Sequence, residues 1–439
     1  MSHHCSHEKS PMKKPNILSN DASICVIIFI CTLLHRLAYL ATLEINDPIR
    51  GDAGKYLAVA YNLIHSGSYS LALQPPLEPT TLITPGYPFF LSAILFFSKS
   101  PSSFYDIALI VQAILSSASA VFVYLISIKI MSKPFAVATC ALFIISPHLN
   151  IMCGYLLTET LFIFFLMLSL YLLTNSAEHE GSIRFLLSGI TIGIACLVRP
   201  ALLLLPVIIA LSYSYHKKWK FKKSYAVLLF AGTAIAYSPW LIWKQWNKDA
   251  DQVSLFSAAL TLGSYPDLIY KSPEFRGKPY LEDSEYDNMA KSPKYALKII
   301  LERAQKSPAE YAKWYLYGKE TTFLQPGIIA GIGGAFIYPI EKSIYDKVPL
   351  ESFLYWIMFN SHTFFVVVTF GYIFFCIYKK NLRRQPYPAT LLASLILYFL
   401  SVHSILAPLP RYSIPIYPAI YILTVYAAYL LLESRRDHN

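Results

Sequence analysis

An acidic and aromatic segment follows directly after the first long hydrophobic stretch of the chain. It runs from Asp47 to Tyr56 with a second carboxylate at Asp52, and the sequence Thr-Pro-Gly-Tyr-Pro follows at residues 84–88. Carboxylates are common at membrane surfaces, but one that stands where a helix begins, ahead of many hydrophobic stretches, indicates a site. We interpret this arrangement as a membrane-embedded enzyme rather than a channel or a scaffold.

The composition is that of a membrane protein. Hydrophobic residues make up 55% of the 439 residues and charged residues 14%, whereas a soluble domain carries about 25% charged residues. Apolar stretches of about 20 residues recur, which is the length that crosses a bilayer. Such stretches must be helices, because in lipid the backbone can bond only to itself. We therefore expect an all-α, multi-pass membrane protein.

The basic residues predict how the chain is oriented in the membrane. They cluster in short segments between hydrophobic stretches, so the net charge of +11 reflects sidedness and gives no indication of nucleic-acid binding. The run 216–223 is the strongest cytoplasmic marker, and Lys13 and Lys14 place the N-terminus on the same side. Both termini are then cytoplasmic, and Asp52 falls outside. The short N-terminal tail favours a bacterial inner membrane.

About ten transmembrane spans and one large outer loop follow from this sidedness. The spans are expected near residues 23–43, 104–129, 135–154, 160–174, 184–198, 201–215, 224–243, 352–378, 388–407 and 413–432. The chain then divides into a cytoplasmic tail, an N-terminal transmembrane module, a large outer loop and C-terminal helices. These four parts cover residues 1–22, 23–243 (with a first outer loop at 44–103), 244–350 and 351–439. A loop as long as 244–350 is usually functional.

Three further segments are expected at the outer membrane surface. Residues 53–66 read as an amphipathic helix that Asp52 caps and Gly67 ends. The apolar segment Tyr87–Phe97 is too short to span and is expected to be interfacial or re-entrant. The Gly-rich apolar segment Gly327–Ile340 is also expected to be interfacial.

Five motifs occur in an order and a sidedness typical of one superfamily. They are Asp52 with Tyr56, Thr-Pro-Gly-Tyr-Pro at 84–88, Ser146-Pro147 ahead of Thr158-Glu159-Thr160, Cys196-Leu-Val-Arg199-Pro200, and Arg411-Tyr412-Ser-Ile-Pro415. Together they resemble the protein O-mannosyltransferase superfamily of membrane glycosyltransferases, which includes the bacterial lipid A aminoarabinose transferase. The resemblance spans nearly the whole chain and implies a GT-C-like helix bundle.

The resemblance implies that a sugar moves from a polyprenyl-phosphate carrier to an acceptor on the outer side of the membrane. By position, Asp52 is the expected catalytic base, and direct displacement gives inversion. The departing phosphate needs cations, and arginine forks suit phosphate oxygens, so Arg199 and Arg411 are expected to bind the donor. Glu159 is expected to bind the acceptor or a metal. A divalent cation shared by Glu159 and Asp52 stays open, and no other cofactor is indicated.

Four further residues complete the predicted substrate-binding set. Tyr56, Tyr87 and Tyr412 are expected to line the site, although aromatic residues are also common at membrane interfaces. Asp47 precedes a proline, which is typical of a turn, and is included as a candidate with a direct role.

The resemblance has one departure, and alternatives remain. Aminoarabinose transferases carry a Lys-Pro-Pro segment in the first loop, whereas residues 83–86 here read Ile-Thr-Pro-Gly, so the lipid A enzyme itself is disfavoured. The acceptor stays open among lipid, glycan and protein. A transporter or flippase would show charges in mid-span and repeated halves. A polymerase or ligase with a diphosphate donor, or an inactive scaffold, also remains.

Overall fold

The structure, a computed structural model, describes residues 17–179, 182–216, 223–266, 268, 283–326 and 340–436. Within these ranges the chain folds into helices, and its one extended pairing is an isolated bridge between Glu44 and Lys342. The predicted all-α class is confirmed. The segment 327–339, most of the apolar stretch expected at the interface, lies outside the described residues.

Six helical segments in the described ranges are long and apolar enough to cross a membrane. They comprise α1 (Ile17–Thr42), α4 (Pro101–Ser127), α10 (Lys223–Trp246), α17 (Pro349–Asn360) with α18 (His362–Tyr378), α19 (Tyr387–Ile405), and η6 (Pro410–Ile416) with α20 (Tyr417–Arg436). Three shorter apolar helices coincide with the fourth to sixth predicted spans. These are α7 (Glu159–His179), α8 (Ser182–Val198) and α9 (Leu205–His216). The count of ten spans therefore remains a prediction.

The third predicted span, 135–154, is broken rather than continuous. It consists of α5 (Lys133–Ile145), then α6 (Pro147–Ile151) with η1 (Met152–Gly154), and the two parts are bent by 54°. The break falls at Pro147, which has no backbone N–H to continue a helix. If α5 and the α6–η1 segment together form one span, the described ranges contain seven candidate spans instead of six.

Arg36 holds this break from inside the bundle. Its fully buried guanidinium donates to the carbonyls of Phe143 at 3.1 Å and Ile144 at 2.8 Å, at the end of α5. It also donates to Ser116 on α4 at 3.2 Å. A cation at a helix C-terminus satisfies carbonyls that the helix leaves unpaired. The bend is therefore a built feature of the fold.

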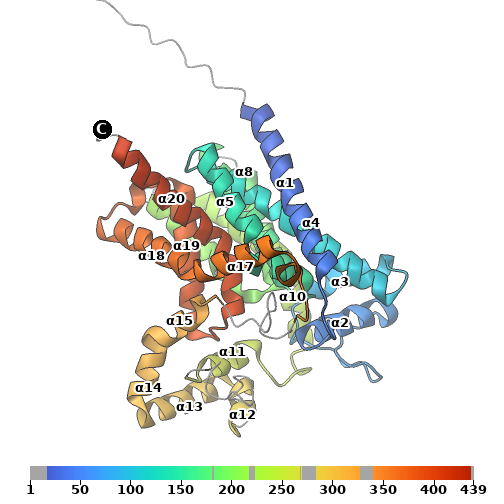
Figure 1. The fold of residues 1–439 in the computed structure, drawn as a ribbon. Coiled ribbons are helices and arrows are strands. Elements are labelled where there is room, and N and C mark those ends of the chain that lie inside the picture. The colour runs from blue at the N-terminus through green and yellow to red at the C-terminus, as the bar shows by residue number, and fades with distance from the viewer. Residues whose placement is uncertain are drawn as a thin grey trace, which may run out of the picture.

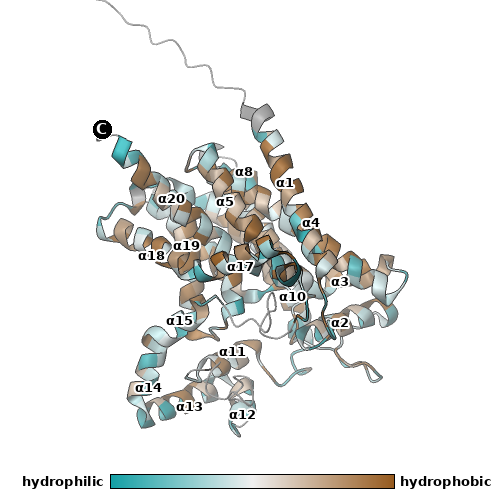
Figure 2. Ribbon diagram, viewed as in Figure 1, coloured by the Kyte–Doolittle hydropathy of each residue, from teal (hydrophilic) through white to brown (hydrophobic). Residues whose placement is uncertain are grey.

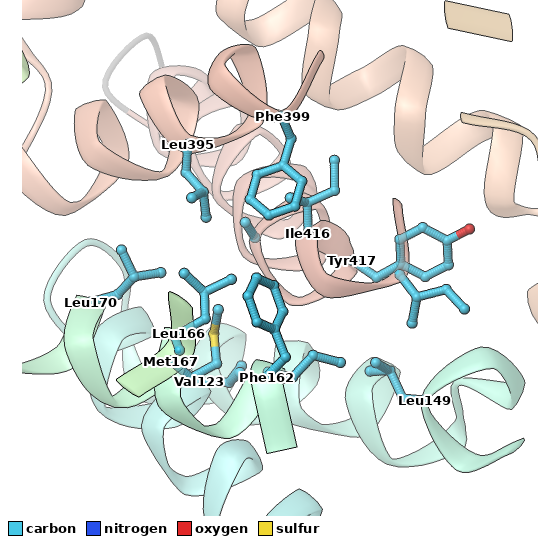
Figure 3. Close-up of a cluster of buried hydrophobic side chains, with 14 of the residues drawn as sticks. Val123, Leu149, Phe162, Leu166, Met167, Leu170, Leu395, Phe399, Ile416 and Tyr417 are labelled. Carbon is cyan, nitrogen blue, oxygen red and sulfur yellow. The ribbon is translucent and has the colours of Figure 1, made fainter. Parts of the chain in front are cut away.

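A buried apolar core surrounds α7 (Figure 3). Phe162, Leu166 and Leu170 on α7 face Leu395 on α19 and Ile416 on η6, and all five are buried. Hydrophobic residues predominate in the bundle helices, while α12 and α14 carry more hydrophilic residues (Figure 2). Because this core packs α7 against α19 and η6, it places the first residue of α7 beside η6.

A helical lobe, defined here as α11–α15, lies at one end of the bundle (Figure 1). It contains α11 (Leu255–Gly263), α12 (Tyr286–Lys291), α13 (Pro293–Lys306), α14 (Pro308–Lys313), the π-helix η4 (Trp314–Gly318) and α15 (Lys319–Leu324). The C-terminal end of α20 lies at the opposite end of the bundle. Lys319 ties the lobe to the bundle, because its Nζ donates to the carbonyl of Ile405 at 2.9 Å.

Candidate functional site

The site begins at α2 (Asp52–Ser66), and its start differs from the prediction. Asp52 is not the N-cap: Gly51 takes that position with a φ of 58° and makes no side-chain cap bond. A positive φ suits glycine, so Gly51 turns the chain, and Asp52 becomes the first helical residue. The predicted end is confirmed, since Gly67 closes the helix with a φ of 64°.

Asp52 belongs to a network of four charged side chains that are distant in sequence. Arg411 Nη2 lies 3.1 Å from Asp52 Oδ2, and Arg411 Nε lies 3.2 Å from Glu159 Oε1. The same oxygen of Glu159 lies 3.2 Å from Arg199 Nη2. We call these residues the Asp52–Arg411 network. The structure thus brings together the four charged residues for which the resemblance implied the central roles.

The network runs from the surface into the protein. The side chain of Asp52 is 34% exposed, whereas that of Glu159 is only 1% exposed. Lys55, which the sequence reasoning missed, lies 3.8 Å from Asp52 at the exposed edge, three residues along the same helix. That spacing was a usable signal, because residues three apart share a helix face. The accessible end of the network is therefore the carboxylate of Asp52.

Glu159 is placed by the start of α7. As the first residue of that helix, its carboxylate lies at the positive end of the helix dipole, which favours an anion. The preceding turn is fixed by side chains: Thr160 Oγ1 donates to the carbonyl of Met152 at 3.1 Å, and Gln112 Nε2 to that of Tyr155 at 2.8 Å. The carboxylate is thereby held where both arginines reach it.

Arg199 is placed by the Thr-Pro-Gly-Tyr-Pro motif. It follows directly after α8, and Thr84 Oγ1 donates to the carbonyl of Val198 at 3.1 Å. A Cβ added to Gly86 would lie 2.7 Å from the backbone of Leu197 and Val198. The motif therefore packs backbone against backbone at the residue before Arg199, and only glycine allows that approach at position 86.

We expect Gly86→Ala to displace the end of α8, because the Cβ has no space. Overpacking of this kind costs about 1–3 kcal/mol, and donor affinity should fall with the shift of Arg199. Thermal unfolding and polyprenyl-phosphate binding measure the two effects. Gly371→Ala in α18 is the matched control, since nothing lies within 4 Å of its added Cβ. Equal effects of the two substitutions would show that Gly86 does not position Arg199.

Three tyrosines were predicted to line the site, and their places differ. The ring of Tyr412 lies 4.8 Å from the guanidinium carbon of Arg199 and 5.6 Å from that of Arg411, so it contacts both cations. Tyr56 is partly buried and packs edge-on against Tyr87 at 5.2 Å. Tyr87 itself is fully buried, and its hydroxyl donates to Gln112 at 2.9 Å. Tyr87 therefore supports Tyr56 from behind.

Asp47 is not brought into the network. It lies exposed in the loop before α2 with a φ of 52°, and it forms no ion pair within the described ranges. An Asp before a proline commonly occupies a turn, and the short polar side chain tolerates this left-handed conformation. The structure gives Asp47 a turn geometry and no contact with Asp52.

The arginines keep the carboxylate of Asp52 ionised. Burial of Asp52 raises its pKa, but the charge and hydrogen bond of Arg411, with the charges of Lys55 and Arg199, outweigh that effect and hold the pKa of Asp52 below its usual value. Burial followed by the charge of Asp52 raises the pKa of Tyr56, which stays protonated at neutral pH.

Two polar atoms of the network remain available to a ligand. Glu159 Oε2 and Arg411 Nη1 are buried and have no hydrogen-bond partner in the part of the chain that the structure describes. Burying such groups unpaired costs free energy, so their presence in one network points to a polar substrate group. A divalent cation shared by Asp52 and Glu159 does not fit these residues, because Arg411 already contacts both carboxylates.

Comparisons with known proteins show which fold this chain has. Residues 84–243, which is less than half of the chain, match the family described as dolichyl-phosphate-mannose-protein mannosyltransferase. Oligosaccharyltransferase AglB from Archaeoglobus fulgidus, in complex with an inhibitory peptide and a dolichol-phosphate, is similar with a TM-score of 0.52 and 14% identity. The similarity covers 95% of this chain and 51% of that chain. This chain has the GT-C fold.

Further comparisons give the fold of this chain but not its activity. The apo form of the Archaeoglobus fulgidus oligosaccharyltransferase gives a TM-score of 0.52 at 16% identity, over 94% of this chain and 51% of that one. ArnT from Cupriavidus metallidurans, bound to undecaprenyl phosphate, is 12% identical over 94% of this chain and 77% of that chain. Its TM-score of 0.41 is too low to show a shared fold. The curated proteins give no sequence match. The chain spans about half the length of the oligosaccharyltransferase, so the fold is shared and the activity is a separate question.

Proposed function

We propose that this protein is a membrane glycosyltransferase that moves a sugar from a polyprenyl-phosphate carrier to an acceptor on the outer face of the membrane. The observation that carries the proposal is the Asp52–Arg411 network, in which a partly exposed carboxylate is joined to two arginines that are only 11% and 16% exposed, within a GT-C fold. The partial match to mannosyltransferases of the dolichyl-phosphate-mannose type supports a lipid-linked donor.

The base in this reaction is Asp52. Its ionised carboxylate accepts the proton of the acceptor hydroxyl as the oxygen forms a bond to the anomeric carbon. The bond from that carbon to the phosphate oxygen breaks, and polyprenyl phosphate leaves with the electron pair. Attack opposite the leaving group inverts the anomeric centre. The proton ends on Asp52 and is released to solvent, to which this side chain is 34% exposed.

Arg411 and Arg199 neutralise the departing phosphate. Guanidinium groups bind phosphate oxygens in pairs, and Arg411 Nη1 has no other partner within the described ranges. One oxygen of Glu159 pairs with both guanidinium groups. Its negative charge keeps the two positive charges close together when no sugar donor is bound. Tyr412 packs against both cations and Tyr56 lies beside Asp52, so each is assigned a wall of the donor site.

The transporter alternative predicts charged residues along a transmembrane path. Arg36 is a fully buried charge within α1, but it donates to the carbonyls that end α5 and to Ser116. These bonds are those of a structural cap, so Arg36 gives no specific support to a transport path. No observation at the site favours a diphosphate donor.

Sugar transfer by the purified protein tests the donor class. The protein is supplied with a labelled sugar on polyprenyl monophosphate or on polyprenyl diphosphate, with membrane extract as the acceptor pool. We expect label to leave the monophosphate carrier only, because two arginines match one phosphate group. Transfer from the diphosphate alone would support the polymerase or ligase alternative. Transfer from neither carrier by folded protein would contradict the proposal.

The predicted topology has its own test, because the reaction requires Asp52 to lie outside. Lys298 on α13 is exposed in the helical lobe, and Arg436 is exposed at the opposite end of the bundle. We expect a cysteine at position 298 to react with an impermeant maleimide added outside intact cells. A cysteine at 436 serves as the control and should react only after lysis. The reverse pattern would place the network inside and overturn the proposal.

A further inference from the structure

The helical lobe contains a cleft of about 190 Å³ that the reaction above does not use. One face of the continuous helix α14–η4–α15 lines it from Glu310 to Gln325, over roughly four turns, and Pro266 after α11 contributes the other side. The lining residues on this helix recur at spacings of three and four, so they share one face.

The floor of the cleft is rigid and aromatic. Trp314 is buried, and its Nε1 donates to the carbonyl of Gly263 at 2.9 Å, which fixes the plane of the indole. Gly318 lies directly against this ring, because a Cβ there would be 2.6 Å from it. Both residues belong to the π-helix, a rare form that frequently occurs at functional sites.

The walls of the cleft combine an aromatic ring with hydroxyl, acidic and basic groups. Tyr317 is 52% exposed, and Glu310, Lys313 and Thr321 are exposed beside it. A pyranose matches this set, since its C–H face packs on an aromatic ring and its hydroxyls both donate and accept hydrogen bonds. Pockets for drug-sized ligands measure about 300–1,000 Å³, so the smaller cleft suits one sugar unit.

The cleft adjoins the Asp52–Arg411 network through its floor. Leu409, two residues before Arg411, packs against the small buried cluster that contains Trp314. In addition, α15 packs against η6, which contains Arg411. Gly263, which accepts the indole hydrogen bond, lies against the backbone of Leu406, where an added Cβ would be 2.4 Å from the carbonyl oxygen. A glycan that occupies the cleft would therefore contact the lobe next to the segment that leads to Arg411.

We propose that this cleft binds one sugar unit of a glycan acceptor and so selects glycans over proteins and simple lipids. The assignment of the bound sugar as an acceptor rests on the proposed function. The binding itself depends only on the cleft. Tyr317 contributes the stacking face, and Thr321 with Glu310 and Lys313 contributes the polar contacts that distinguish one sugar from another.

The test measures sugar binding and sugar transfer separately on the full-length protein. A panel of methyl pyranosides is titrated by saturation-transfer NMR, and we expect one stereochemistry to bind wild type and Asp52→Asn equally. Tyr317→Ala should weaken that binding about tenfold, while Tyr317→Phe retains it because the ring remains. Leu316→Ala is the matched control, since Leu316 is the neighbouring residue, is 78% exposed and does not line the cleft. In transfer to a glycan, Tyr317→Ala should raise KM for the acceptor and leave KM for the donor unchanged.

The outcomes separate the two proposals. Pyranoside binding that Tyr317→Ala removes, without any transfer, would support the cleft and contradict the transferase. Transfer to a glycan with the same acceptor KM in wild type and Tyr317→Ala would overturn the cleft and leave the transferase standing. The proposed sugar site would also be overturned if wild type binds no pyranoside, or if Tyr317→Ala and Leu316→Ala lose the same amount of pyranoside affinity.

Discussion

Replacing Asp52 with asparagine is expected to lower the rate of sugar transfer about a hundredfold to ten-thousandfold, the usual contribution of a general base. Asparagine has nearly the same shape, and its side-chain oxygen can still accept the bond from Arg411, so the protein should fold. What is lost is the charge that takes the proton. The measurement is the initial rate at saturating donor, with thermal unfolding recorded on the same preparation.

The matched control for Asp52→Asn is Glu78→Gln, which neutralises an exposed carboxylate in the same predicted outer loop. We expect that variant to keep the wild-type rate, since no described contact joins Glu78 to the network. A wild-type rate in Asp52→Asn would show that Asp52 is not the base. Equal losses in the two variants would show a general effect of charge on the loop.

The second large effect is expected from Arg411→Gln. This side chain contacts both carboxylates and offers Nη1 to the donor, so donor affinity should fall about tenfold to a hundredfold, as charge-assisted bonds are lost. Binding of polyprenyl phosphate to the purified protein measures this directly. Arg303→Gln is the control, because Arg303 also pairs with an aspartate, Asp283 at 2.7 Å, but lies in the helical lobe. Equal weakening by both substitutions would contradict a phosphate role for Arg411.

The same substitution should change the pH dependence of the reaction. Arg411 is the largest influence that lowers the pKa of Asp52, against the burial that raises it. With Arg411 present, Asp52 remains ionised down to pH values below its usual pKa of about 3.9. Its contribution to stability is therefore present above that value and lost as the pH falls further. In Arg411→Gln the pKa rises, so the acidic limb of the residual activity should move to higher pH; an unmoved limb would mean that Arg411 does not tune the base.

The sequence motifs anticipated much of the candidate site. The order and sidedness of the motifs pointed to Asp52, Glu159, Arg199 and Arg411, and the structure places these four in one network. Which arginine contacts which carboxylate could not be predicted, since Glu159 on α7 and Arg411 on η6 meet only through the packing of α7, α19 and η6 (Figure 3). The roles of these residues remain proposals that the variants above test.

One local feature was predicted wrongly and a second was not predicted, although the signals for both were present. Asp52 was expected to cap its helix, but the preceding Gly51 takes the positive φ that turns the chain, and glycine is the residue suited to it. The break at Pro147 within the third predicted span was not predicted, although proline interrupts helices. The burial of Tyr87 had no such signal, because an interfacial and a buried tyrosine look alike in sequence.

The central claim is that the Asp52–Arg411 network transfers a sugar from a polyprenyl-phosphate carrier, and one measurement tests it most directly. Purified protein is given a donor labelled in both the sugar and the polyprenyl chain, with membrane extract as acceptor. The account predicts that sugar label enters a product while an equal amount of polyprenyl phosphate is released, and that both depend on Asp52. The account would be contradicted if folded protein neither transfers the sugar label nor releases polyprenyl phosphate, or if wild type and Asp52→Asn do so equally.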